Sequence, residues 1–366
     1  MRPHSSSLPH PTSRVQSLDA LRGVAVLAVV GYHMTTSPAL VELFSPVAKT
    51  LLSMGGLGVE LFYVLSGYFI TKSVLGMPEF DQAQFLQARV RRIYPAYLVC
   101  LAVCLAVAVA VQRATPESTT LCLLLHLVML HNLFPGVSSL FNGVFWTLGV
   151  EFPYYLLMMA LGGLLRGARG FWWTTAGLFI GALLFRASVF FFIPLDSYGG
   201  MGRSFFSTQL PGALDLFAAG GVACALTRGR SLPRPSLQQG VLWAGVVSTL
   251  GLIALAIQHM GDFWSNRWMV TYWRSALALA LACVVMASVW MQAGPWLAWS
   301  GLPWLGKISF SVYLWHYPVI ELLTAQGQGL PLWMRGLTAI LLTLLVSWTS
   351  WRWIETRFHH PAPSAT

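Results

Sequence analysis

Long apolar runs separated by short polar segments dominate this chain. A helix needs about 20 predominantly apolar residues to cross the hydrocarbon core of a bilayer. Runs of that length lie near residues 15–34, 55–75, 93–112, 143–165, 172–194, 206–227, 238–259, 271–292, 304–324 and 332–354. The pattern predicts an all-α fold, a polytopic transmembrane helix bundle of about ten spans.

A weaker apolar segment covers residues 119–133, and the basic residues indicate whether it crosses the membrane. If it does not cross, the clusters at 89–92, 166–169 and 228–234 all lie on the cytoplasmic side, as the positive-inside rule favours. If it crosses, the last two clusters move outside. We therefore expect ten spans with both termini cytoplasmic, and a short re-entrant or interfacial piece at 119–133.

The composition supports a membrane protein. Of the 366 residues 56% are hydrophobic and 9% are charged, whereas soluble domains carry roughly 25% charged residues. The net charge of +10 comes mostly from short loops, which indicates orientation in a membrane rather than nucleic-acid binding. The five cysteines lie in apolar segments without metal-ligand spacing, so we expect no disulfide framework and no metal.

The ends of the chain differ from its middle. Residues 1–14 are rich in Pro, Ser and His and are expected to be a disordered cytoplasmic tail, and residues 359–366 a second cytoplasmic tail. No small-residue cleavage site follows the first apolar run, so we interpret it as a retained span rather than a signal peptide. One transmembrane domain is expected over residues 15–358.

The first span carries two polar side chains, Arg22 and His33, eleven residues apart. That separation is close to three helical turns, so both side chains leave the same face, about 16 Å apart along the helix axis. Polar side chains inside a span are candidate functional residues. The alternative is that Arg22 reaches the lipid head groups and His33 caps the outer end of the helix.

A basic cluster precedes the third span. Arg89 and Arg92 are three residues apart, on one face of a helix whose early turn contains Pro95. Arginine forks suit phosphate and pyrophosphate groups. The alternative is an ordinary basic cluster that only orients the protein in the membrane.

Two carboxylates lie within apolar segments. Glu60 is near the outer end of the second span, where it needs a partner or water, and Ser66 on the same span can bond a carbonyl or face a cavity. Glu151 lies in the fourth span. It either orients or charge-balances a histidine, or is a structural acid bonded to the backbone.

The C-terminal spans add a histidine and another acid. His316 lies in mid-span ahead of Pro318, and a proline in a span often lines a cavity. His316 is thus either a second residue of the site or a core histidine bonded to a neighbouring carbonyl. Glu355 is expected to pair with Arg352 or Arg357 at the inner surface.

Five sequence fragments in this order resemble the acyltransferase-3 family of integral-membrane O-acyltransferases. They are an Arg and a His separated by ten residues, GVELFYVLSGYFI, an Arg-x-x-Arg, WTLGVEF and SVYLWHYP. The resemblance runs from Ser17 to about Phe358. Tyr63 and Tyr68 stand where phenylalanines are usual, and the hydrolase-like domain of longer members is absent, which leaves open whether a separate extracytoplasmic transferase completes the reaction.

The resemblance implies an activity. Members move an acyl group, usually acetyl, from a cytoplasmic acyl-CoA to a hydroxyl of a sugar in a surface glycan or lipid-linked precursor. It implies that Arg89, Arg92 and Arg22 hold the CoA phosphates and that His33 is the general base, with Arg22 and Glu151 in the catalytic set. A histidyl-acyl intermediate on His33 is the alternative.

Further expectations follow from the resemblance. His316, Glu60, Ser66 and Tyr313 are expected to bind the acceptor, with acetyl-CoA as the donor and no metal. The expected surroundings are the lipid bilayer of a bacterial inner membrane, with a carbohydrate or other hydroxyl-bearing acceptor and no nucleic acid. The acceptor, the acyl chain length and the oligomeric state stay open.

Two other classes of protein share part of this pattern. Intramembrane His and Glu with a basic loop also describe a proton-coupled transporter or flippase, but no second copy of the Arg22/His33 face is present. A non-catalytic sensor or scaffold gives no reason for so many polar residues at depth. Acyl-CoA turnover distinguishes the enzyme from both.

Overall fold

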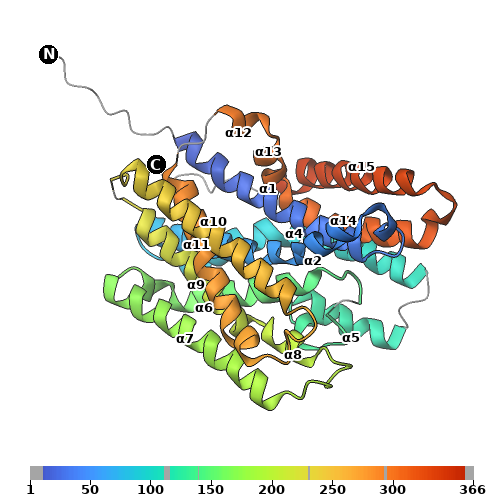
Figure 1. Ribbon diagram of the computed structural model, residues 1–366, viewed down its shortest axis with the longest axis horizontal. Helices are drawn as coiled ribbons and strands as arrows, with labels where there is room; N and C mark the ends of the chain where they lie inside the picture. The colour runs from blue at the N-terminus through green and yellow to red at the C-terminus, as the bar shows by residue number, and fades with distance from the viewer. Residues whose placement is uncertain (1–10, 111–115, 139, 230, 292–294, 359–366) are drawn as a thin grey trace.

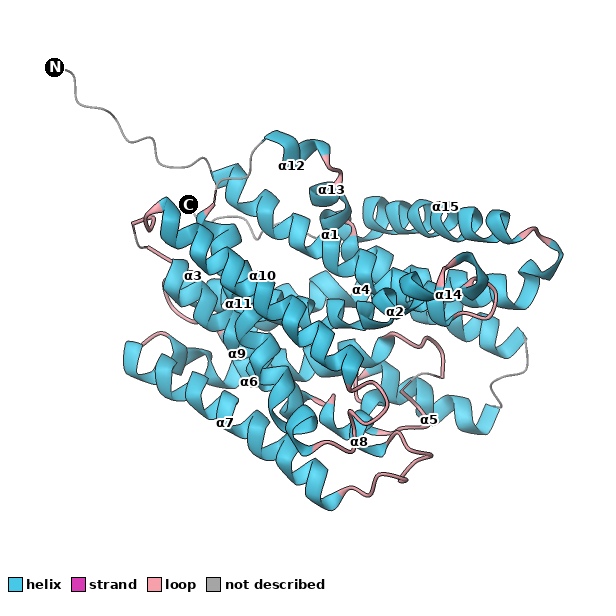
Figure 2. Ribbon diagram, in the orientation of Figure 1, coloured by secondary structure: helices cyan, strands magenta, loops and turns pink. Residues whose placement is uncertain are grey.

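The computed structural model describes residues 11–110, 116–138, 140–229, 231–291 and 295–358. Within these ranges the chain forms helices and connecting loops, without a strand (Figure 2). The expected all-α class is therefore confirmed. The tail residues 1–10 and 359–366 lie outside the described residues, and the first helix already begins at Pro11.

The described residues form sixteen α-helices, and Figure 1 colours them from blue at the N-terminus to red at the C-terminus. Their bounds are α1 Pro11–Thr36, α2 Pro46–Ser53, α3 Gly58–Gly76, α4 Gln82–Ala110, α5 Pro116–Leu127, α6 Leu148–Leu165, α7 Ala168–Phe192, α8 Gly202–Ser207, α9 Leu210–Thr227, α10 Pro235–Gln258, α11 Arg274–Trp290, α12 Pro295–Trp299, α13 Leu302–Lys307, α14 Ser309–Gln326, α15 Leu332–Ser350 and α16 Thr356–Phe358. Short 3-10 turns are η1 Val41–Leu43, η2 Met54–Leu57, η3 His131–Leu133, η4 Phe145–Thr147 and η6 Gly327–Gly329, and two π-helical turns are η5 Met269–Trp273 and η7 Trp351–Glu355.

Eight helical segments in the described chain are long and apolar enough to cross a membrane. They correspond to eight of the ten expected spans. The other two expected spans, 15–34 and 304–324, are occupied by α1 and by α13 with α14. The segment at 119–133 contains only the 12-residue helix α5 and η3, too short to cross; whether it is re-entrant or interfacial stays a prediction.

The helix α1 is central to the bundle, because it packs against α3, α11, α13 and α14 (Figure 1). Small residues make these contacts close. A Cβ added at Gly58 would lie 2.3 Å from the carbonyl oxygen of Ala25, and one at Gly55 would lie 2.1 Å from that of Ala28. The glycines of the second span therefore serve packing of α3 and η2 on α1.

The helix that contains most of the third expected span, 93–112, begins well before that span. The helix α4 begins at Gln82 rather than near residue 93, because the polar stretch before the apolar run is rich in good helix formers. Pro95 consequently lies inside α4 and not in an early turn. Arg89 and Arg92 thus project one turn apart from a continuous helix.

Candidate functional site

One cavity gathers six of the nine predicted site residues. It holds about 740 Å³ of space, part of it continuous with solvent, among α1, α3, α4, α6 and α14. The predicted residues on its wall are Arg22, Ser66, Arg89, Arg92, Glu151 and Tyr313. We call this space the cationic cavity.

Three arginines give the cationic cavity its charge, against one carboxylate, Glu151, on its wall. In the described part of the chain none of the three guanidinium groups has a hydrogen bond or ion-pair partner. The Nε of Arg89 is buried without an acceptor, and its guanidinium lies 5.3 Å from the ring centre of Phe85. Arg22 and Arg92 are close enough to repel each other. Unpaired charges of one sign are costly to bury, so this wall is suited to an anion.

Glu151 is held by two hydroxyl groups. Ser66 Oγ and Tyr155 Oη each donate a hydrogen bond of 2.5 Å to its Oε1. No histidine contacts Glu151 among the described residues. This carboxylate therefore lies in the cationic cavity as a fixed counter-charge, away from the two histidines of the site.

Tyr313 joins the cationic cavity to those histidines. Its Oη donates to the carbonyl of Val144 at 3.1 Å and accepts from Thr147 Oγ1 at 2.9 Å. These bonds fix the ring on the cavity wall. The other side of the ring faces His316, with 5.8 Å between the ring centres.

His33 and His316 lie side by side, with ring centres 5.1 Å apart. His316 is fully buried, and its Nδ1 lies 3.0 Å from the carbonyl oxygen of Val312. That geometry assigns the proton to Nδ1 and leaves Nε2, which is buried without a partner, as a free acceptor. His33 is only partly buried and also contacts the rings of Tyr32 and Tyr317.

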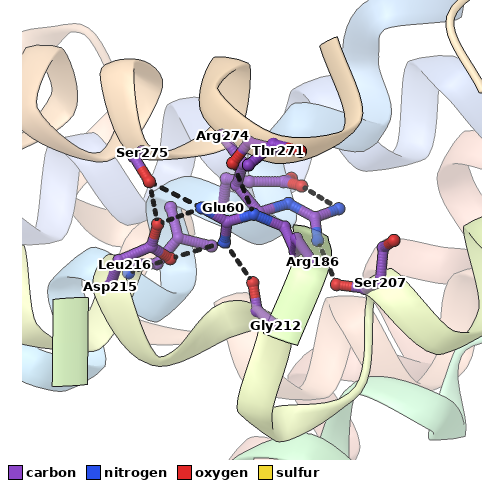
Figure 3. A network of polar contacts seen from close by, with 9 residues as sticks. All are labelled: Glu60, Arg186, Ser207, Gly212, Asp215, Leu216, Thr271, Arg274 and Ser275. Carbon is purple, nitrogen blue, oxygen red and sulfur yellow. Dashed lines mark hydrogen bonds and ion pairs between the residues drawn. The ribbon is translucent and has the colours of Figure 1, made fainter. Parts of the chain in front are cut away.

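Glu60 lies apart from the cationic cavity. Its Oε1 is 3.4 Å from the guanidinium of Arg274, and the pair borders a network around Arg186 and Asp215 (Figure 3). The structure therefore brings Glu60 to a different cavity from that of Arg22, Arg89 and Arg92.

The expected pairing of Glu355 was wrong. Ser311 Oγ donates a short hydrogen bond to Glu355, whereas Arg352 and Arg357 lie over the ring of Trp353 at 5.5 and 5.4 Å. The π-helical turn η7 shifts the residues of this segment relative to an α-helix. Glu355 is instead near enough to Arg22 and Arg92 for their charges to act on its carboxylate.

Tyr155, Thr147 and Glu355 were not among the predicted site residues. Tyr155 lies four residues after Glu151, a helical spacing that places both on one face, so the sequence contained a signal for it. Thr147 and Glu355 gave no such signal, because their partners come from other helices. The assembled site runs from the arginine wall, past Tyr313, to a pair of imidazoles.

A family model described as "Acyltransferase domain" matches residues 15–352 of the chain. No solved structure matches it. The matched range includes every side chain described above except Trp353, Glu355 and Arg357.

Curated relatives are similar over most of this chain. The "Putative peptidoglycan O-acetyltransferase YrhL" of Bacillus subtilis is 26% identical over 371 residues, covering 93% of this chain and 54% of that protein. The "Peptidoglycan O-acetyltransferase OatA" of Listeria monocytogenes is 27% identical, covering 93% and 55%. The "Putative membrane-bound transacylase BcsY" of Komagataeibacter xylinus is 26% identical, covering 85% and 74%. The chain thus spans about half the length of the first two relatives.

Proposed function

Because the chain belongs to the acyltransferase-3 family, whose acyltransferase domain it matches from residue 15 to residue 352, we propose that it is a membrane O-acyltransferase with acetyl-CoA as donor. The acceptor is a hydroxyl of a sugar in peptidoglycan, the polymer named for two of its relatives, or in another envelope polysaccharide. The site belongs in a bacterial inner membrane with both chain termini in the cytoplasm.

The observation that carries the proposal is the unpaired arginine wall of the cationic cavity. Arg22, Arg89 and Arg92 line one space, and none of them is in direct ion-pair contact with a carboxylate among the described residues. CoA presents a pyrophosphate and a ribose phosphate, which accept bidentate bonds from guanidinium groups. The buried Nε of Arg89, which has no acceptor in the protein, fits such a ligand.

The pantetheine arm then extends along α1 towards His33. Arg22 and His33 are separated by about 16 Å along the helix axis, and Tyr313 lines the intervening wall. The thioester carbonyl is thereby brought to the imidazoles while the phosphates stay on the arginines.

His33 acts there as general base. It takes the proton of the acceptor hydroxyl as that oxygen attacks the thioester carbonyl. The C–S bond breaks, an ester forms, and the CoA thiolate leaves and receives the proton from His33. An imidazole can accept one proton and give it back, which suits this exchange. If His33 instead attacks the thioester itself, an acyl-imidazole forms first and the acceptor then displaces it.

The test measures acetyl-CoA turnover and CoA affinity of the detergent-purified chain. We expect His33→Ala to abolish turnover while CoA still binds, and Arg92→Ala to weaken CoA binding by roughly tenfold or more. Arg91→Ala is the matched control, because Arg91 is the exposed neighbour of Arg92 and does not line the cavity.

Three results would overturn the proposal or part of it. Absence of acetyl-CoA turnover in the wild type with every acceptor glycan rejects the donor. Full activity of His33→Ala would show that His33 takes no part in the reaction. Equal loss of CoA affinity in Arg91→Ala and Arg92→Ala would show that these arginines attract CoA only through general surface charge.

A further inference from the structure

A second cavity lies at the end of α1 opposite to Arg22. It is bounded by η2, the start of α3, α8, the end of α10 and the π-helical turn η5. Its space is about 1000 Å³, part of it continuous with solvent. Tyr32 lines this cavity, and its ring centre is 5.0 Å from that of His33. The second cavity therefore ends one side chain away from the proposed base.

The polar groups of the second cavity are incompletely bonded. Glu60 and Arg274 form its ion pair, with 12% and 11% of their side chains exposed. The Oγ of Ser207 and the Nε of Arg274 are buried and have no hydrogen-bond partner among the described residues. Burying a polar group without a hydrogen-bond partner destabilises the protein, so a ligand that offers hydroxyl groups would satisfy both atoms.

A rigid polar network holds Arg274 and Ser207 in place (Figure 3). Arg274 donates a 2.6 Å bond to the carbonyl of Ser207. Beside it Arg186 bonds both carboxylate oxygens of Asp215, at 3.1 and 2.7 Å, and Ser275, which follows Arg274 on α11, donates to the same carboxylate at 2.5 Å. The cavity wall is thus fixed by buried partners before any ligand binds.

The turn that leads into Arg274 is π-helical, η5. Such turns often occur at functional sites, because the extra residue changes the direction of neighbouring side chains. Three of the five residues of this turn, Met269, Val270 and Trp273, line the second cavity. The local distortion therefore belongs to the cavity and not to a helix contact elsewhere.

Charge and aromatic content distinguish the two cavities. The charged residues of the second cavity are one acid and one base in contact, Glu60 and Arg274, whereas the cationic cavity has an excess of arginines. Trp264 and Trp273 add aromatic side chains to the wall. A flat ring can pack against the C–H face of a sugar while charged groups bond its hydroxyls.

We propose that this second cavity binds a neutral carbohydrate, the acceptor of the acyl group. The inference rests on the proposed function for the identity of the reaction. Glu60, near the start of α3, lines the second cavity, and Tyr63 and Ser66, within the next two turns, line the cationic cavity. Donor and acceptor then approach from different levels along α3 and meet at His33.

The test titrates the purified full chain with a tetrasaccharide of β-1,4-linked N-acetylglucosamine, without any acyl donor. We expect Trp264→Ala and Glu60→Gln to weaken binding by roughly tenfold each, and Trp264→Phe to retain part of the affinity. Trp268→Ala is the matched control, because Trp268 is 58% exposed close by and does not line the cavity. Melting temperatures of the variants check that each one folds.

Two outcomes overturn this inference: the wild type fails to bind the tetrasaccharide, or Trp264→Ala and Glu60→Gln both bind it as the wild type does. A CoA titration of the same samples separates this result from the proposed function. A wild type that binds the sugar but not CoA supports the second cavity and rejects the acyl-CoA donor. A wild type that binds CoA but not the sugar supports the acyl-CoA donor and rejects the second cavity as the acceptor site.

Discussion

His33 on α1 and His316 on α14 come from distant parts of the chain, yet their ring centres lie 5.1 Å apart. The Val312 carbonyl accepts from His316 Nδ1, so His316 has a fixed proton and a fixed orientation. Two adjacent imidazolium ions would repel each other. The pair is therefore suited to carry one exchangeable proton, with His316 as a positioning residue for His33.

The variant His316→Phe separates packing from polarity. Phenylalanine keeps a ring against His33 but removes both nitrogens. We expect kcat to fall roughly tenfold to a hundredfold, a typical share of acid–base catalysis, while KM for acetyl-CoA changes little. Steady-state kinetics checks this. Wild-type kcat in His316→Phe would identify His316 as a core histidine with no part in the reaction.

Glu151→Gln tests the role of the carboxylate on the wall of the cationic cavity. The amide oxygen of glutamine can still accept from Ser66 and Tyr155, so the local structure is retained while the negative charge is lost. We expect CoA to bind roughly threefold to tenfold tighter, with a steeper dependence on salt. If turnover instead falls more than about a hundredfold at unchanged affinity, Glu151 takes a direct part in the chemistry.

The sequence was sufficient to predict the charged residues that line the cationic cavity. Helical periodicity places Arg22 and His33 on one face, and Arg89 and Arg92 on another, without knowledge of neighbouring helices. The positions of Arg22, Arg89, Arg92 and Glu151 around one cavity agree with those faces. Periodicity predicts the side of a helix on which a residue lies, and in a bundle each inward side contacts another helix.

Partners across helices could not be predicted in this way. Glu60 meets Arg274 and Glu355 meets Ser311, and each pair depends on the order in which helices pack. A π-helical turn precedes Arg274 and another contains Glu355. Each such turn changes the facing of the residues beyond it, so the 3.6-residue pattern no longer indicates their faces.

The contact of α3 with α9 predicts a severe effect of Gly220→Ala. A Cβ at Gly220 would lie 1.8 Å from the carbonyl oxygen of Val64, so the two backbones must separate. We expect a loss of more than about 2 kcal/mol of stability, seen as a lower melting temperature in detergent. Gly251→Ala in α10 is the control, because nothing lies within 4 Å of that position. Equal melting temperatures would contradict the close packing.

One ion pair of the protein is buried and another is exposed, so their removal is expected to lower stability by different amounts. Arg186 and Asp215 are 2.7 Å apart and 1% and 0% exposed, so Arg186→Met leaves a buried carboxylate unpaired. We expect Arg186→Met to lower the free energy of unfolding by about 3–5 kcal/mol. Lys49→Met removes an exposed pair, with 34% and 73% of its side chains accessible, and should cost less than about 1 kcal/mol. Thermal unfolding measures both, and similar losses would argue against the buried network as a stabilising frame.

A stacked pair of histidines outside the membrane-spanning helices has no role in the proposed reaction. The rings of His126 and His131 are nearly parallel, 6° apart, with centres separated by 4.2 Å, and both are fully buried. His126 Nδ1 bonds the carbonyl of Cys122 and His131 Nε2 that of Phe145. The other nitrogen of each ring has no partner among the described residues. Both imidazoles are thus held in the neutral form.

This pair predicts that the protein loses stability on acidification. Burial, the largest cause, lowers the pKa of His126 from 6.5 to about 4 and also lowers that of His131. The unfolded chain therefore binds more protons below pH 6.5, and stability present above that pH is lost as the pH falls towards 4. We expect the melting temperature to fall between pH 7 and about pH 5, and to fall less in His126→Phe. An equal decline in that variant would assign the acid sensitivity to other groups.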